Sequence, residues 1–138
     1  MKLFVDTGGW LALADRSDSR HQSAANFYAQ RSRRSGRIFT SNFVFDEFLT
    51  LLFNRRPFAE ASRFAKALLA SPFVTVEEVS RERFGAALEL RFKFSDKPKI
   101  SFTDLTSMVI MREFGIVDVM TADNQFRQVG LGFHTLPE

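Results

Sequence analysis

The sequence has 138 residues, of which 45% are hydrophobic and 25% charged, and a net charge of +3. These values are typical of one globular domain with a real core, here expected to span residues 1–138. The chain contains no Cys and no apolar run near the length of a membrane span, which excludes a disulfide framework, a thiolate nucleophile, a sulfur-based zinc site and a membrane protein. No signal peptide precedes the first expected strand, so we expect a cytoplasmic protein.

The chain opens with a β-prone run, Lys2–Val5, which predicts a strand with Asp6 at its carboxyl end. Gly8-Gly9 then predicts a tight turn, followed by a short helix over Trp10–Ala14. Asp6 has two interpretations, as a turn-favouring residue or as a site carboxylate. A phosphate-binding loop is excluded because no Gly-Lys-Ser/Thr follows. An aspartyl phosphatase would need a second Asp at position 8.

The next segment, His21–Arg34, has the pattern of an amphipathic helix. It ends in the basic residues Arg31, Arg33 and Arg34. His21 opens the helix, where a single His is more often a capping or packing residue than a ligand. A short strand is expected over Arg37–Thr40.

A third helix is predicted over Ser41–Asn54, with Ser41 or Asn42 as its N-cap. Glu47 lies at the margin of the apolar face, whereas Asp46 is rotated about 100° toward the polar side. A carboxylate beside aromatic and leucine side chains is unfavourable unless its charge is compensated. Glu47 therefore either extends to solvent or binds a cation.

The middle of the chain predicts two more helices around a strand. The helices are expected over Ala59–Ala70 and Arg81–Phe94, and the strand over Val74–Val79. Lys97 and Lys99 add positive charge after the second of these helices.

The most informative stretch is Ser101–Phe126. A helix is expected from Ser101, with Asp104 in a capping-box arrangement and Gly115 ending it. Asp118–Thr121 has the apolar pattern of a buried parallel strand, and Asp123 follows it. Asp104 could simply complement the helix dipole, and Asp123 could cap the next short helix. A last strand is expected within Gly130–Leu136, where His134 is interpreted as structural.

The alternation of strands and helices predicts one parallel sheet with helices on both faces, a three-layer α/β/α sandwich. Strand ends in such a sheet share one edge, and ligands bind there. Four acids stand at strand ends or on the helices that follow, so they can converge: Asp6, Glu47, Asp104 and Asp123. Four hydroxyl residues lie beside them as possible supporting hydrogen bonders: Thr7, Ser41, Thr103 and Thr121.

Clustered carboxylates repel one another, and a hard divalent cation removes this repulsion. An all-oxygen ligand set without His or Cys favours Mg²⁺ or Mn²⁺ over zinc. Such ions activate water and stabilise charge at phosphoryl groups. If the acids gather in one site, the remaining surface becomes more basic than the net charge suggests, and a phosphodiester is the natural substrate.

The order and spacing of these parts resemble the PIN-domain ribonucleases, and within them the VapC toxins of VapBC toxin–antitoxin pairs. The resemblance covers nearly the whole chain. It is carried by Phe4-Val5-Asp6-Thr7 followed by Trp10-Leu11-Ala12-Leu13, the Glu47 helix opened by Thr40-Ser41, the run Ser101-Phe102-Thr103-Asp104, and Met120-Thr121-Ala122-Asp123 with Phe126-Arg127-Gln128.

The resemblance implies an α/β/α sandwich with an acidic Mg²⁺ or Mn²⁺ site that cleaves RNA. In that scheme Asp6, Asp104 and Asp123 bind the metal directly or through water, and Glu47 orients or deprotonates the attacking water. Thr121 matches a hydroxyl often found near the last acid. The resemblance also implies a homodimer and an antitoxin partner, with the Phe-rich helices around Pro57 as candidate contacts.

Candidate phosphate contacts are the basic residues Arg31, Arg33, Arg34, Lys97 and Lys99, although any single residue of this kind is more often a solvated surface charge. Three alternatives remain. The same site could serve a DNA nuclease or a housekeeping RNA-processing enzyme, since no base-reading motif separates them. The chain could also be a non-catalytic RNA- or protein-binding module. A phosphoacceptor receiver domain is disfavoured because the carboxyl-terminal strands contain no Lys.

Overall fold

The computed structural model describes residues 2–34 and 37–137. Within these residues the chain forms five strands and seven helices. The strands are β1 (Lys2–Val5), β2 (Arg37–Ser41), β3 (Val74–Glu77), β4 (Asp118–Met120) and β5 (His134–Leu136). The helices are α1 (Thr7–Ala14), α2 (His21–Arg33), α3 (Asn42–Arg55), α4 (Phe58–Ala70), α5 (Arg81–Lys93), α6 (Phe102–Phe114) and α7 (Gln125–Gln128).

The five strands form one parallel sheet in the order β3-β2-β1-β4-β5. Its centre is apolar on both faces: Leu3, Phe4 and Val5 of β1 are buried, as are Ile38 and Phe39 of β2. A strand that is buried on both faces needs helices on both sides of the sheet.

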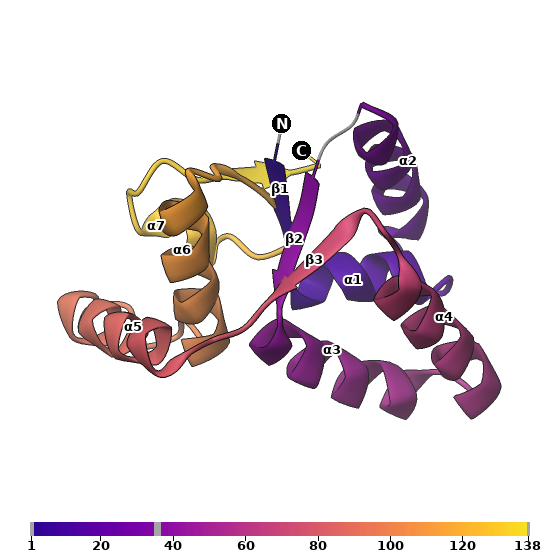
Figure 1. Ribbon diagram of the computed structural model, residues 1–138, viewed down its shortest axis with the longest axis horizontal. Helices are drawn as coiled ribbons and strands as arrows, with labels where there is room; N and C mark the ends of the chain where they lie inside the picture. The colour runs from indigo at the N-terminus through magenta and orange to yellow at the C-terminus, as the bar shows by residue number, and fades with distance from the viewer. Residues whose placement is uncertain (1, 35–36, 138) are drawn as a thin grey trace.

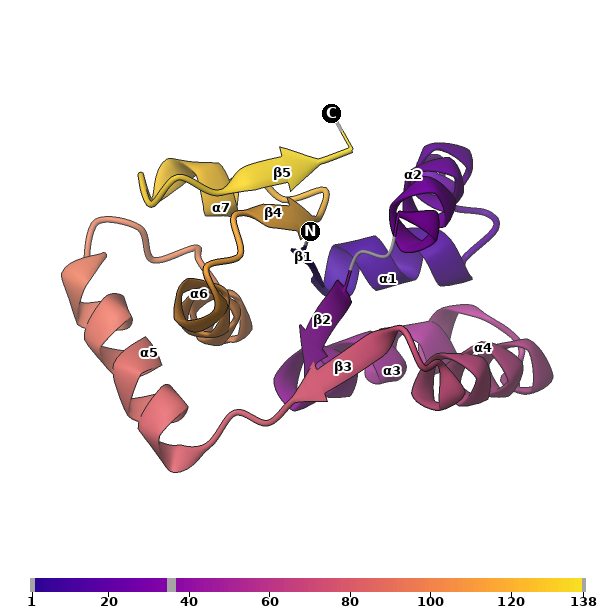
Figure 2. The same cartoon turned by 45° about the horizontal axis from the view of Figure 1, so that its top comes forward.

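Helices cover both faces of the sheet. In Figures 1 and 2, α1–α4 gather on one side of the sheet, whereas α5 and α6 lie on the other, with α7 beside β5. The three-layer α/β/α fold that the sequence predicts is therefore confirmed. Within the described part of the chain, no helix is long and apolar enough to cross a membrane.

Hydroxyl and carboxyl side chains start four of the helices by capping free backbone N–H groups. Ser41 accepts from Val44 at the start of α3, Ser80 does the same in α5, and Ser101 accepts from Asp104 in α6. Gly115 ends α6 with φ of 66°, as its sequence position predicts. The caps fix where these helices leave the carboxyl edge of the sheet.

The predicted turn at Gly8-Gly9 is wrong, because both glycines lie inside α1, which begins at Thr7. Asp6 accepts a hydrogen bond from the Gly9 N–H, so the helix starts directly after the strand. A Cβ built on Gly9 would lie 2.5 Å from the Met120 carbonyl oxygen and 2.9 Å from Val5 Cγ1. Gly9 is thus required because α1 packs closely against β4, and a turn conformation is not the reason.

We expect Gly9→Ala to destabilise the fold by about 2–4 kcal/mol, because the added methyl group must push the α1 backbone away from Met120. The matched control is Gly85→Ala in α5, where a Cβ added to Gly85 would meet nothing within 4 Å. That variant is expected to gain about 0.5–1 kcal/mol from helix propensity. Urea denaturation of both variants measures the difference, and equal stability of the two would contradict the close packing.

Candidate active site

The order of the sheet creates a crevice at one edge. The chain moves outward from β1 through β2 to β3, then returns to the other side of β1 to form β4 and β5. In parallel sheets such a reversal opens a crevice at the carboxyl ends of the two strands that flank it. Asp6 directly follows β1 and Thr121 directly follows β4, so both lie at this crevice.

Four carboxylates from four parts of the chain line one cleft at this edge. We call it the acidic cleft; it has a volume of about 630 Å³ and includes Asp6, Thr7, Glu47, Lys99, Asp104 and Asp123. Its carboxylates come from the end of β1, from α3, from the first turn of α6 and from the segment after β4. The convergence expected from the sequence therefore occurs.

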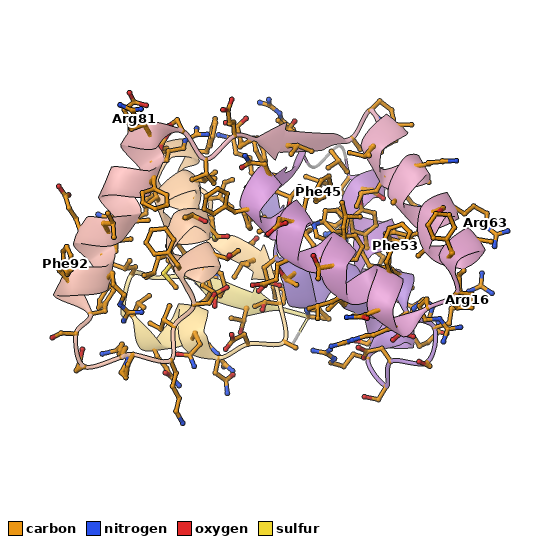
Figure 3. The ribbon with its side chains drawn as sticks, turned by 90° about the horizontal axis from the view of Figure 1, so that it is seen from below. Arg16, Phe45, Phe53, Arg63, Arg81 and Phe92 are labelled. Atoms are coloured by element: carbon orange, nitrogen blue, oxygen red, sulfur yellow. The ribbon has the colours of Figure 1, made fainter. Side chains whose placement is uncertain are left out.

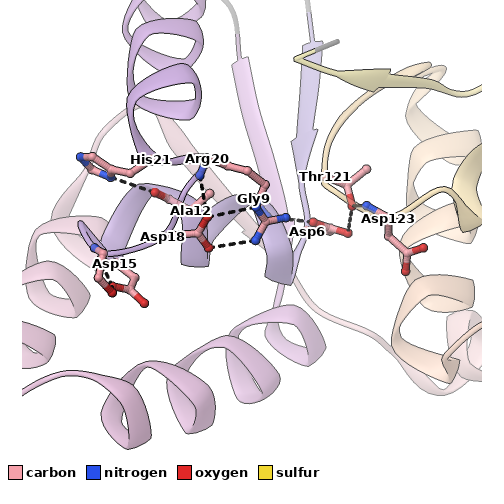
Figure 4. Close-up of polar contacts among 10 residues, drawn as sticks. Asp6, Gly9, Ala12, Asp15, Asp18, Arg20, His21, Thr121 and Asp123 are labelled. Atoms are coloured by element: carbon pink, nitrogen blue, oxygen red, sulfur yellow. Dashed lines mark hydrogen bonds and ion pairs between the residues drawn. The ribbon is translucent and has the colours of Figure 1, made fainter.

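Asp6 is almost fully buried and held at both oxygens. Its Oδ1 accepts from the Gly9 N–H at 3.0 Å, and its Oδ2 accepts from the Thr121 hydroxyl at 2.6 Å (Figure 4). Burial raises the pKa of Asp6 to about 6, against the lowering effect of these two hydrogen bonds. The charges of Asp123 and Glu47 raise it further. Asp6 is thus a fixed carboxylate in an environment that disfavours its charge.

Asp104 lies in the first turn of α6, where its backbone N–H donates to Ser101 Oγ at 3.1 Å. Burial raises the pKa of its carboxyl to about 7, and the charge of Asp6 adds to this effect, followed by those of Asp123 and Glu47. The mutual influence of all four acids on the pKa values of Asp6 and Asp104 is the electrostatic signature of one site.

Asp123 and Glu47 are less confined than the two buried acids. Asp123 is exposed, and its Oδ1 accepts from the Gln125 N–H at 2.9 Å, just before α7. Glu47 is half-buried on α3, while Asp46 beside it is exposed, as predicted. Two of the four carboxylates are therefore buried, and the other two are more accessible to solvent.

The acidic side chains of the cleft suit a hard divalent cation, since all four are carboxylates and supply oxygen ligands. Thr7 Oγ1 is buried in the same cleft and has no hydrogen-bond partner among the described residues, so it is a further candidate oxygen ligand. Within residues 2–34 and 37–137, no three His, Cys, Asp or Glu side chains are already arranged to hold an ion. Carboxylates that lack a cation repel one another, and a bound cation would remove this repulsion.

Of the four predicted supporting hydroxyls, the structure brings two to the cleft. Thr121 donates to Asp6 and accepts from the Asp123 N–H at 3.0 Å, and Thr7 lines the wall. Ser41 instead caps α3 through Val44, and the Thr103 side chain is not among the residues that line the cleft.

We expect Thr121→Val to raise the pKa of Asp6 further, because the variant removes the hydrogen bond that most strongly favours the Asp6 carboxylate. Loss of such an orienting partner typically costs about 10–100-fold in metal affinity or activity. Titration of Asp6 by NMR measures the shift. Thr50→Val is a suitable control, since the Thr50 hydroxyl only donates to the Asp46 carbonyl on the exposed side of α3. An unchanged Asp6 pKa in Thr121→Val would contradict the role of Thr121.

Among the predicted phosphate contacts, only Lys99 lines the acidic cleft. Arg31 is buried and pairs with Asp118 Oδ2 at 2.6 Å, at the start of β4 and so at the opposite edge of the sheet. Arg31 is thus bound within the fold and lies away from the acidic cleft. Arg33 and Arg34 are exposed at the same far end of α2, and Lys97 pairs with Asp96 at 3.0 Å.

Neither histidine lies in the acidic cleft. His21 Nδ1 donates to the Ala12 carbonyl at 2.9 Å and so holds the start of α2 against α1 (Figure 4), which agrees with its interpretation as a packing residue. His134 lies 3.3 Å from Asp118 Oδ1 at the amino-terminal edge. Both imidazoles therefore have structural contacts outside the acidic cleft.

Arg20 was not predicted from the sequence as a residue of the site. It lies beside the acidic cleft, and the charge of Asp6 adds to the rise in its pKa, after the larger effect of the Asp18 hydrogen bond. Arg20 stands in a polar loop between two helices, where no periodic pattern marks it.

An α/β/α sandwich with four carboxylates at the carboxyl edge of its parallel sheet defines a PIN-like domain. Comparison with known proteins agrees: the PIN domain profile matches residues 3–131. In Mycobacterium tuberculosis, the 23S rRNA-specific endonuclease VapC20 is 36% identical over 128 residues, covering 93% of this chain and 94% of VapC20. The chain belongs to the PIN-domain family, on the branch that contains the VapC toxins.

Two solved structures are also similar to this chain. The crystal structure of Mycobacterium tuberculosis VapC20, described as a Sarcin-Ricin loop cleaving toxin, matches with a TM-score of 0.83 and 33% identity over 93% of this chain and 95% of that chain. VapBC2 from Rickettsia felis, bound to a promoter DNA fragment, matches with a TM-score of 0.75 and 14% identity over 98% and 97%. The second likeness supports the fold alone.

Proposed function

We propose that this chain is a metal-dependent endoribonuclease that hydrolyses RNA phosphodiester bonds in the acidic cleft. The observation that carries the proposal is the convergence of Asp6, Glu47, Asp104 and Asp123 in one cleft at the reversal point of the sheet. The VapC relatives are named as endonucleases, which supports the reaction class. The whole of residues 1–138 would act as one nuclease domain.

Asp6, Asp104 and Asp123 would hold the metal ion, with Mg²⁺ or Mn²⁺ the ions that suit an all-oxygen set. The ion would supply Lewis-acid stabilisation of charge at the phosphate and an acidified water molecule. Thr121 would keep Asp6 and the Asp123 backbone in register, since it hydrogen bonds to both.

Glu47 would orient and deprotonate the attacking water. It is less buried than Asp6 and Asp104, and it lies on a separate helix that lines the same cleft. In this reaction a water oxygen forms a bond to phosphorus, and the bond from phosphorus to the ribose 3′ oxygen breaks. The products carry a 5′-phosphate and a 3′-hydroxyl. Attack by the ribose 2′-hydroxyl would leave a cyclic phosphate instead.

The substrate we propose is a structured RNA, with a loop of 23S rRNA as the first candidate. Its support is the specificity for which VapC20 is named, since VapC20 shares 36% identity with this chain across nearly its whole length. Action on ribosomal RNA would place the protein in the cytoplasm.

We propose further that the chain is the toxin of a toxin–antitoxin pair and forms a homodimer. Phe53 at the end of α3 and Phe58 at the start of α4 are exposed by 38% and 76%, with ring centroids 5.4 Å apart. Figure 3 shows Phe53 on α3 and Phe92 on α5. Exposed aromatic clusters of this kind are typical of protein contacts, and the antitoxin and a second copy of the chain are the two proposed occupants.

The test is cleavage of a panel that contains a stem–loop of 23S rRNA, an unrelated stem–loop, an unstructured RNA and a DNA oligonucleotide. The purified protein is incubated with Mg²⁺, with Mn²⁺ or with chelator. We expect cleavage of the 23S stem–loop that requires metal. Cleavage of DNA would instead favour the DNA nuclease, and binding without cleavage would favour the non-catalytic module.

A further inference from the structure

A second cleft continues from the acidic cleft along the carboxyl edge of the sheet. We call it the Arg20 cleft; it has a volume of about 270 Å³ and includes Gly8, Ala12, Arg20, Ser23, Thr121 and Ala122. Gly8, Thr121 and Ala122 also line the acidic cleft, so the two clefts adjoin at these residues. A chain longer than one nucleotide that enters the acidic cleft can extend along it.

The loop that carries Arg20 is fixed by its own hydrogen bonds. Asp15 Oδ1 accepts from the Ser17 N–H and hydroxyl at 3.0 and 2.6 Å. The Asp18 N–H donates to the Asp15 carbonyl, and the His21 N–H donates to that of Asp18. Arg20 therefore starts from a backbone that α1 and α2 hold in place.

The guanidinium of Arg20 is held on one side only. Its Nε and Nη2 donate to the two oxygens of Asp18 at 3.0 and 2.9 Å (Figure 4). Within the described residues no hydrogen bond from Nη1 is found, and the side chain is 45% exposed. An orientated guanidinium with a free edge can donate to a phosphate.

The positive charge of Arg20 is favourable for RNA binding at this position. A cleft lined by four carboxylates repels an RNA backbone, so its rims need positive charge. Lys99 supplies one cation in the acidic cleft, and Arg20 lies on the other side of Gly8 and Thr121. The influence of Asp6 on the pKa of Arg20 agrees with their closeness.

We propose that Arg20 binds a backbone phosphate of the RNA that neighbours the cleaved one, in the Arg20 cleft. The inference rests on the proposed function, since it takes RNA as the substrate. Arg20 is then a substrate-binding residue. The RNA would run across the molecule from Lys99, past the four carboxylates, to Arg20.

The experiment separates binding from cleavage by using the Asp104→Asn protein as the parent. A fluorescein-labelled 23S stem–loop is titrated by anisotropy at salt concentrations between about 50 and 200 mM. Arg20→Ala in this parent is expected to weaken binding several-fold and to reduce the salt slope by about 0.7–0.9, the value of one phosphate contact. Arg20→Lys is expected to retain the slope with weaker affinity, because it keeps the charge and loses the guanidinium geometry.

The matched control is Arg81→Ala, since Arg81 is exposed at the start of α5 (Figure 3) and lines neither cleft. Affinity and slope equal in Arg20→Ala and Arg81→Ala would overturn the inference. So would a fall in thermal stability of Arg20→Ala with an unchanged salt slope, which indicates a structural role in the loop. If the Asp104→Asn parent does not bind RNA, the inference is overturned as well, because Arg20 would then have no RNA phosphate to bind. If the Arg20→Ala effect is present but the wild-type protein cuts no RNA, the nuclease proposal alone fails.

Discussion

Asp104→Asn is expected to lower the rate of RNA cleavage by about a thousandfold or more, because in the proposed function Asp104 is one of the carboxylates that hold the metal ion together. Asparagine keeps nearly the same shape and leaves the Ser101 cap intact, since that hydrogen bond uses the backbone N–H of residue 104. Single-turnover cleavage with saturating protein measures the loss at the chemical step.

The control for this prediction is Asp46→Asn. Asp46 is an exposed acid on α3, next to Glu47 in sequence but outside the acidic cleft. The Asp46→Asn protein should cleave RNA at the wild-type rate. Equal losses in both variants would mean that net charge, and not the position of the carboxylate, governs activity.

The metal-free protein is expected to become less stable as the pH rises. The carboxyls of Asp6 and Asp104 have pKa values raised from 3.8 to about 6 and about 7, so the folded chain holds these protons more tightly than the unfolded chain. Between pH 4 and pH 7 the folded state therefore binds more protons, and the free energy of unfolding falls with pH. The raised pKa of Asp6 alone lowers the free energy of unfolding by about 3 kcal/mol over this range, since each pKa unit corresponds to about 1.4 kcal/mol.

Thermal unfolding in chelator, from pH 4 to pH 8, measures this dependence. A loss of about 3 kcal/mol corresponds to a fall on the order of 10 °C in Tm for a domain of this size. Asp104→Asn should unfold at a higher temperature than the wild-type protein at pH 8 and show a smaller difference at pH 4. Added Mn²⁺ should raise the wild-type Tm at pH 8. A wild-type Tm that rises with pH in chelator would contradict the raised pKa values of Asp6 and Asp104.

The fold and the acids could be predicted from the sequence because both follow from local patterns. Short apolar runs alternate with amphipathic helices, and the strand-end rule places Asp6 and Asp123 at one edge whatever the exact helix lengths. Gly115 ends α6 where the sequence predicts, since a left-handed residue is needed there. The PIN resemblance was confirmed by comparison.

Other features depend on contacts between distant segments, which a local pattern does not report. Gly9 looks like a turn residue, but its constraint is the Met120 carbonyl of β4. Arg31 belongs to a basic run, yet it follows Ala24 and Tyr28 at helical spacing and is buried against Asp118. That spacing was the available signal. No sequence pattern marks Arg20, because its proposed role depends on where two adjoining clefts lie in the folded chain.

The most direct test of the acidic cleft as a hydrolytic RNA site is the chemistry of the cut ends. The 23S stem–loop is cleaved with Mg²⁺, and the new termini are identified by mass spectrometry, beside an Asp104→Asn protein prepared in the same way. We predict a 5′-phosphate and a 3′-hydroxyl from the wild-type protein and no cut from the variant. A 2′,3′-cyclic phosphate, or equal cutting by both proteins, would contradict hydrolysis by these carboxylates.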